Sequence, residues 1–143
     1  MPDHYHQPED FRYDENNFNT DPVVTNKNWD DFNADTKMES LRSYILDDAT
    51  HFKTNRLMMP WGDDFWFSNA HLTFDNLHNT IEYFNAKYDD ITLLYSTPSE
   101  YINALKEDKE IKWPVRYDDM FPYADQSEDY WTGYFTSRAD SKK

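Results

Sequence analysis

The chain has 143 residues, enough for one domain or for part of one. Its 28 acidic and 14 basic side chains give a formal net charge of −14, which repels nucleic-acid phosphates and anionic lipid. Nucleic acid and membrane surfaces are therefore poor candidate partners. Aromatic residues make up 18% of the chain, more than a disordered acidic tail contains, so the composition predicts a folded protein with a core.

Residues 1–34 are polar and are interrupted by Pro2, Pro8 and Pro22. This pattern predicts an irregular acidic arm that packs against the rest of a larger protein, followed by a domain over residues 35–143. The first thirty residues contain neither a basic n-region nor an apolar h-region, so no signal peptide is predicted. The chain lacks cysteine, which excludes disulfides and thiolate metal sites without fixing the compartment.

A first helix is predicted from Asp35, because apolar residues then recur at spacings of three and four. The residues that carry this pattern are Met38, Leu41, Tyr44, Ile45, Ala49 and Phe52. Residues 56–59 follow as a short apolar run that Pro60 ends, and the length of the run favours a buried strand.

A second helix is predicted to begin after Ser68 or Asn69, either of which can cap its first turn. Its expected apolar face consists of Leu72, Leu77, Ile81, Phe84 and Tyr88. Residues 91–95 are rich in apolar and β-branched side chains and predict a second buried strand.

A third helix is predicted to begin at Thr97, which is followed by Pro98 at the first helical position and by Glu100 three residues after the cap. Strands that alternate with helices over short connections are typical of an α/β protein with a parallel sheet or barrel. From Lys112 onward the sequence predicts long ordered loops that are rich in aromatic residues.

Two adjacent carboxylates, Asp63 and Asp64, follow the first predicted strand and stand among aromatic residues. Functional groups gather at the carboxyl ends of parallel strands. A second negative charge and apolar rings both raise the pKa of a carboxyl group, which suits a general acid. The alternative is that the pair only turns the loop and caps the next helix, and that the rings are plain core instead of sugar-stacking surfaces.

Neither of two possible metal motifs is convincing. His4 and His6 lack a third ligand at a usual spacing, and residues 14–17 lack the glycine and the final glutamate of a calcium loop. We therefore predict no metal ligand in this chain.

Five ordered blocks of sequence resemble the N-terminal catalytic domain of glycoside hydrolase family 38, especially its lysosomal α-mannosidase branch. The blocks are residues 52–55 (Phe-Lys-Thr-Asn), 61–65 (Trp-Gly-Asp-Asp-Phe), 94–98 (Leu-Tyr-Ser-Thr-Pro), 118–125 (Asp-Asp-Met-Phe-Pro-Tyr-Ala-Asp) and 130–138 (Tyr-Trp-Thr-Gly-Tyr-Phe-Thr-Ser-Arg). The resemblance implies part of an α/β barrel-like catalytic domain, incomplete in this chain.

The resemblance also implies an activity, which is the retaining hydrolysis of terminal α-mannosyl residues by a zinc enzyme of the lysosome or the secretory pathway. It places the general acid/base at Asp64, a site-shaping role at Asp63, and a wall of the sugar pocket at Trp131. The family's His-x-Asp and Asp-Pro-x-Gly-His motifs, which supply zinc ligands and the nucleophile, have no counterpart here. The chain alone is therefore expected to be inactive, and a non-catalytic carbohydrate-binding or interaction module derived from this fold is the alternative.

Overall fold

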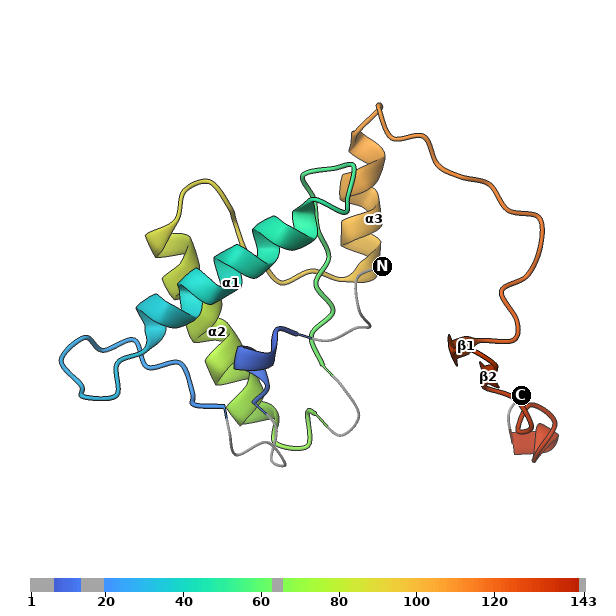
Figure 1. The fold of residues 1–143 in the computed structure, drawn as a ribbon, viewed down its shortest axis with the longest axis horizontal. Coiled ribbons are helices and arrows are strands. Elements are labelled where there is room, and N and C mark those ends of the chain that lie inside the picture. The colour runs from blue at the N-terminus through green and yellow to red at the C-terminus, as the bar shows by residue number, and fades with distance from the viewer. Residues whose placement is uncertain (1–6, 14–19, 63–65, 142–143) are drawn as a thin grey trace. The chain divides into compact units, whose positions relative to one another are not determined.

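The computed structural model describes residues 7–13, 20–62 and 66–141 (Figure 1). The chain divides into two compact units, Met1–Ile111 and Lys112–Lys143. The first contains the 3-10 turn η1 (Glu9–Phe11) and the helices α1 (Ala34–Ala49), α2 (Ala70–Lys87) and α3 (Pro98–Glu107). The second contains the strands β1 (Ala124–Gln126) and β2 (Asp129–Tyr130) and the 3-10 turn η2 (Ala139–Ser141). Within the described residues, no helix combines the length and the hydropathy that a membrane span requires.

Helix α1 confirms the first predicted helix, and it packs against α2 (Figure 1). Its buried residues lie at the predicted spacing of three and four, and they are Ala34, Met38, Leu41 and Ile45. The helix ends at Ala49, so Phe52 lies beyond it, and Tyr44 is 39% exposed instead of buried. The apolar pattern therefore located the helix correctly but overestimated the width of its buried face.

Helix α2 confirms the second predicted helix and its cap, since Asn69 Oδ1 accepts a hydrogen bond from the backbone N–H of Leu72 at 3.4 Å. Its fully buried face, however, is mostly polar, and it comprises Thr73, Asn76, Thr80 and Phe84. The predicted residues Leu72, Leu77 and Ile81 are only half-buried. Such a face is stable because its polar groups find partners inside the fold.

Polar side chains on the buried face of α2 form hydrogen bonds with the N-terminal stretch, which comprises the described residues 7–13 and 20–33. Asn76 Oδ1 accepts a hydrogen bond from the backbone N–H of Val23 at 2.7 Å, and the amide of Asn76 donates to the Leu72 carbonyl at 2.8 Å. Thr73 Oγ1 lies 3.3 Å from the carbonyl oxygen of Tyr13. Residues 7–33 contain only one 3-10 turn among those described, yet Phe11, Tyr13 and Val23 belong to the buried core. The predicted boundary after residue 34 stays a prediction.

Helix α3 confirms the third predicted helix. Thr97 Oγ1 accepts a hydrogen bond from the backbone N–H of Glu100 at 3.3 Å, and the Glu100 carboxylate accepts one from the backbone N–H of Thr97 at 2.7 Å. These reciprocal bonds form a capping box, with Pro98 at the start of the helix.

The predicted parallel strands at 56–59 and 91–95 are not formed in the described residues, whose regular elements are three α-helices, two 3-10 turns and one short antiparallel hairpin, without a barrel. Their side chains do alternate in burial: Leu57, Met59, Ile91 and Leu93 pack against the core, while the residues between them are exposed. A strand also requires a ladder of hydrogen bonds to a neighbouring strand. Leu93 instead bonds the side chain of Asn85, so the alternation predicted the burial but could not supply the pairing partner.

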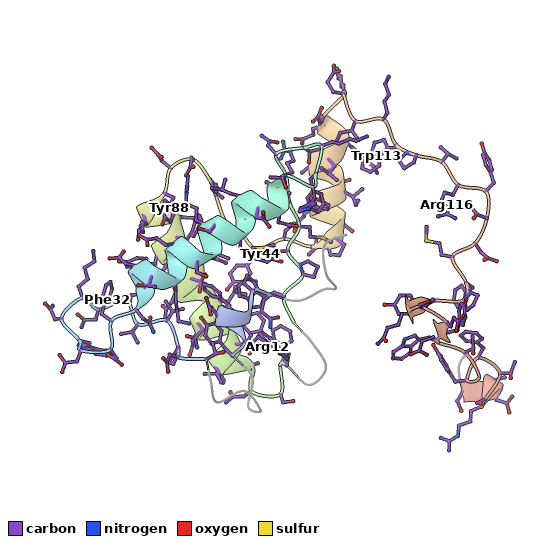
Figure 2. The ribbon with its side chains drawn as sticks, in the orientation of Figure 1. Arg12, Phe32, Tyr44, Tyr88, Trp113 and Arg116 are labelled. Atoms are coloured by element: carbon purple, nitrogen blue, oxygen red, sulfur yellow. The ribbon has the colours of Figure 1, made fainter. Side chains whose placement is uncertain are left out.

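The second unit contains an antiparallel hairpin in which Ala124 pairs with Tyr130 and Gln126 with Asp129. Glu128 adopts a positive φ of 63° at the turn. Before the hairpin, Trp113 and Arg116 lie on a stretch without helix or strand (Figure 2). Arg116 forms a two-pronged contact with the nearby carboxylate of Asp118.

Two close ion pairs involve α1. The first joins the start of α1 to the end of α2, and the second joins the middle of α1 to the residues that follow α2. Lys87 Nζ lies 2.8 Å from Asp35 Oδ1, which also accepts a hydrogen bond from the Tyr83 hydroxyl at 3.0 Å. Arg42 lies 2.6 Å from Asp90 Oδ2, and its guanidinium group is 5.3 Å from the ring centroid of Tyr88, which Figure 2 labels. These contacts fix how α1 and α2 lie against each other.

The ion pair between Lys87 and Asp35 should make the stability of the first unit depend on pH in the acid range. The hydrogen bond from Lys87 is the main reason why the pKa of Asp35 is lowered below its ordinary value of 3.8. The pair therefore stabilises the fold above that value, and this stabilisation is lost as the pH falls through the lowered pKa. We expect Asp35→Asn to lower the urea midpoint at neutral pH, and the difference from the parent chain to shrink below pH 3.8. A difference that is constant across the acid range would contradict this role.

Candidate functional site

The candidate site is the loop between Pro60 and α2. Asp63 and Asp64 lie outside the described residues, so their roles stay predictions. Trp61 and Gly62 are described before them, and Trp66 and Phe67 are described after them. The structure therefore shows how both ends of the loop are held.

The incoming end of the loop is held by the N-terminal stretch. The Trp61 ring packs edge-on against Phe11, with 5.8 Å between ring centroids and 72° between planes. Phe11 is fully buried, and Lys37 Nζ of α1 lies 5.3 Å from its ring centroid. Lys37 Nζ also donates to the Asp10 carbonyl at 2.7 Å, and burial lowers the pKa of this amine. Phe11 thus connects the candidate loop to α1.

The outgoing end of the loop is held by α2. Trp66 is buried, with only 3% of the residue exposed, and its carbonyl oxygen lies 3.3 Å from Thr73 Oγ1. The same hydroxyl lies 3.3 Å from the carbonyl of Tyr13, so one threonine ties the loop to the N-terminal stretch. The sequence pattern did not reveal Thr73, because a threonine on a helix face does not stand out as a core residue.

Aromatic surface surrounds the described part of the loop. Phe67 lies 5.5 Å from Phe74 and 6.4 Å from Trp66 between ring centroids. Phe67 and Phe74 are 43% and 49% exposed, which leaves apolar area available to a ligand. In the described chain, the indole N–H groups of Trp61 and Trp66 are buried and have no hydrogen-bond partner. Apolar rings and two unpartnered indole donors thus stand at the two described ends of the candidate loop.

Gly62 is required by the backbone at the start of the loop. Its φ is +148°, a conformation that residues with a side chain rarely adopt, and a Cβ atom would lie 3.0 Å from Cε2 of Phe67. We expect Gly62→Ala to lower the free energy of unfolding by about 1–3 kcal/mol. Urea denaturation measures this loss. Gly133→Ala is a control for the backbone alone, because its φ is +87° and nothing lies within 4 Å of the added carbon. An equal loss in both variants would exclude the contact with Phe67.

Trp131, the residue predicted to form a wall of the sugar pocket, belongs to the second unit and directly follows β2. Its backbone N–H donates to the Tyr123 carbonyl at 2.8 Å, and the two rings lie 6.2 Å apart with 40° between their planes. Both side chains are about half exposed, at 53% and 51%. The hairpin thus presents a pair of aromatic rings, which is the kind of surface on which the apolar face of a sugar can stack.

No three His, Cys, Asp or Glu side chains come together at metal-binding distance in the part of the chain that the structure describes. The zinc ion that the family resemblance implies therefore has no fitting ligand set among these residues.

Comparisons with known proteins agree on one family. The family described as "Glycosyl hydrolases family 38 N-terminal domain" matches residues 1–126. A "Lysosomal alpha-mannosidase" from Dictyostelium discoideum is 40% identical over 136 residues, which are 94% of this chain and 13% of that protein. The "Lysosomal alpha-mannosidase" of Homo sapiens is 37% identical over 129 residues, 85% of this chain and 12% of its own length.

A plant relative gives the same result. The "Alpha-mannosidase" of Canavalia ensiformis is 36% identical over 138 residues, which are 96% of this chain and 14% of that protein. The chain therefore spans about one seventh or less of each of these three relatives. The match covers most of the chain, including the N-terminal stretch and both aspartates of the candidate loop, and the chain belongs to the glycosyl hydrolase family 38 N-terminal domain family.

Proposed function

We propose that this chain is part of the catalytic domain of a retaining α-mannosidase that removes terminal α-mannosyl residues from glycans. The observation that carries the proposal is the family match, which runs through the Asp63–Asp64 loop, together with relatives named as α-mannosidases. In this proposal Asp64 is the general acid/base, Asp63 shapes the site, and Trp131 binds the sugar ring. The substrate is an α-mannosyl glycan.

The chemistry assigned to Asp64 is proton transfer to and from the glycosidic oxygen. A retaining glycosidase needs a second carboxylate, about 5–5.5 Å from the first, that attacks the sugar. We place that nucleophile, like the zinc ligands, in a part of the enzyme that these 143 residues do not supply. Trp61 and Trp66, held by Phe11 and α2, flank Asp64 in the sequence, and apolar rings near a carboxyl group favour its protonated form. Such a group stays protonated until it delivers its proton.

The proposal also includes the fold of the complete catalytic domain. We propose that residues 56–59 and 91–95 are strands of an α/β barrel-like domain that flanking chain completes, since their side chains already alternate between core and surface. The lysosome or the secretory pathway is the proposed compartment, because several relatives carry the name "Lysosomal alpha-mannosidase".

The experiment that tests the function is a graft. The 143 residues replace the matching segment of the Dictyostelium relative, and we call this chimera the grafted host. It should hydrolyse an aryl α-mannoside, and proton NMR should detect α-mannose as the first product. Release of β-mannose first, or no hydrolysis by a folded grafted host supplied with zinc, would contradict the proposal.

Trp131→Ala tests the sugar-binding surface in the grafted host. Loss of one stacking ring should raise KM by about 3- to 10-fold and change kcat less, because the ring contacts bound sugar before and during the reaction. Steady-state kinetics measures both values. Trp113→Ala is the matched control, since Trp113 is 50% exposed and lies outside the hairpin. Equal changes in the two variants would remove Trp131 from the binding site.

The alternative function is a carbohydrate-binding or interaction module without catalysis. The exposed pair of Tyr123 and Trp131 favours it, because such a pair needs no catalytic group in order to bind a sugar. Titration of the isolated chain with mannose and mannobiose, followed by tryptophan fluorescence, distinguishes the two. Saturable binding by the isolated chain together with an inactive grafted host would favour the module.

A further inference from the structure

The N-terminal stretch contacts both ends of the candidate loop through two residues that are close together in sequence. At the incoming end, the ring centroids of Phe11 and Trp61 lie 5.8 Å apart. At the outgoing end, Thr73 Oγ1 lies 3.3 Å from the carbonyl oxygens of both Tyr13 and Trp66. Phe11 and Tyr13 pack edge-on against each other, with 6.2 Å between ring centroids. These five residues join the two ends of the loop without a gap, and we call them the loop support.

Thr73 is the polar link of the loop support. It lies near the start of α2 and is fully buried, and Tyr13 and Trp66 are each only 3% exposed. A hydroxyl group has one hydrogen, so two carbonyl oxygens at the same distance share it in a three-centre bond. Such a bond is stronger in buried surroundings than in water. Thr73 therefore holds the outgoing end of the loop and the N-terminal stretch at one point of α2.

The position of the loop ends matters for proton transfer. Residues 62–65 lie between Trp61 and Trp66, and a short loop whose two ends are fixed has few conformations available. A general acid must come within hydrogen-bond reach of the atom that it protonates. A displacement of about 1 Å can lower the rate about 100-fold, even when its cause lies far from the reacting atoms. A residue that fixes the loop ends can therefore set the rate of proton transfer without touching the substrate.

We propose that Thr73 is a positioning residue for the general acid/base, and that it acts through its hydroxyl, which fixes Trp66 against Tyr13. The inference rests on the proposed function, because it takes Asp64 as the proton donor. It also gives the N-terminal stretch a part in the reaction, since Tyr13 supplies one of the two carbonyl groups. Thr73 itself is fully buried and is not placed to contact a sugar.

Two substituted forms of the grafted host test this role on two substrates. Methyl α-mannoside has a leaving group that needs a proton, whereas dinitrophenyl α-mannoside has one that does not. Thr73→Val keeps the shape of the side chain but lacks the hydroxyl, and it should lower kcat/KM for the methyl glycoside at least about 10-fold more than for the dinitrophenyl glycoside. Thr73→Ser keeps the hydroxyl, so both values should stay within about 3-fold of those of the unmutated grafted host.

Thr80→Val is the matched control, since Thr80 is also buried on α2 but its hydroxyl donates to the Asn76 carbonyl of the same helix at 2.8 Å. It should affect the two substrates equally. Three results would overturn the proposal: an equal fall for both substrates in Thr73→Val, no fall in that variant, or the same selective loss in Thr73→Ser or Thr80→Val. If Thr73→Val does not fold, Phe11→Leu replaces it, because this change loosens Trp61 at the other end of the loop. An equal effect of Phe11→Leu on both substrates would then overturn the proposal.

Asp64→Asn, measured on the same two substrates, separates this inference from the proposed function. A selective loss in Asp64→Asn without one in Thr73→Val overturns the positioning role and leaves the function standing. A selective loss in Thr73→Val alone refutes Asp64 as the group that Thr73 positions. A folded, zinc-supplied grafted host that is inactive before any substitution refutes both the function and the positioning role.

Discussion

Asp64→Asn is expected to lower kcat/KM of the grafted host on an unactivated α-mannoside by about 10²- to 10⁴-fold. An amide has nearly the shape of the carboxyl group but cannot donate and recover a proton at the glycosidic oxygen. Folding should be unaffected, so the urea midpoint and the zinc content should match those of the unmutated grafted host. Initial rates over a range of substrate concentrations measure the effect.

Asp63→Asn is the matched control for this prediction. It removes the neighbouring charge in the same loop, and we assign Asp63 to shaping the site, so kcat/KM should fall by no more than about 10-fold. If Asp63→Asn has the larger effect, the two residues have been assigned in the wrong order. If neither variant changes the rate, the loop only connects Pro60 to α2.

Phe11→Ala should have the largest effect on stability. Phe11 is fully buried and packs on Trp61 and Tyr13, with ring centroids 5.8 Å and 6.2 Å away. Truncating a buried phenylalanine costs about 3–5 kcal/mol, a large part of the stability of a domain of this size. Thermal and urea unfolding of the isolated chain measure the loss. Loosening Trp61 should also lower the activity of the grafted host, since Phe11 holds the incoming end of the candidate loop.

Trp29→Ala is the control, because Trp29 belongs to the same irregular stretch but is 61% exposed. Its effect should remain within about 0.5 kcal/mol. If Phe11→Ala is equally mild, the N-terminal stretch is not part of the core in solution, and the connection from Phe11 to the candidate loop is lost.

The helices could be predicted from the sequence because the signals that form them are local. Thr97, Pro98 and Glu100 are within one turn of one another, and the resulting capping box appears in the structure as expected. The cap at Asn69 is equally local. The apolar spacing of α1 identified Met38 and Leu41 as buried for the same reason.

Contacts between distant residues could not be predicted in this way. Asn76 is buried because it bonds the backbone of Val23, 53 residues away, and no pattern along α2 reveals that partner. The segment 91–95 alternates as a strand does, but Asn85 takes the place of a neighbour. Phe11 lies in a polar stretch without regular spacing of apolar residues, and only the fold shows that it supports Trp61.

The candidate site shows the same difference between local features, which the sequence predicts, and contacts between distant residues, which it does not. The residue types at Asp63 and Asp64 and their aromatic neighbours left two interpretations open, a general acid or a plain turn, and the structure supplies the supports at both ends of the loop. It also shows that Trp131 lies beside Tyr123, through a backbone hydrogen bond and a tilted contact between the two rings. Kinetic measurements are needed to identify the residue that donates the proton.

The most direct test of Asp64 as the proton donor compares two substrates of the grafted host, dinitrophenyl α-mannoside and methyl α-mannoside. Dinitrophenolate leaves without a proton, whereas methoxide needs one. We predict that Asp64→Asn lowers kcat/KM for the methyl glycoside at least about 100-fold more than for the dinitrophenyl glycoside. An equal fall for both substrates would contradict the account, because it would mean that Asp64 supports the site without delivering the proton.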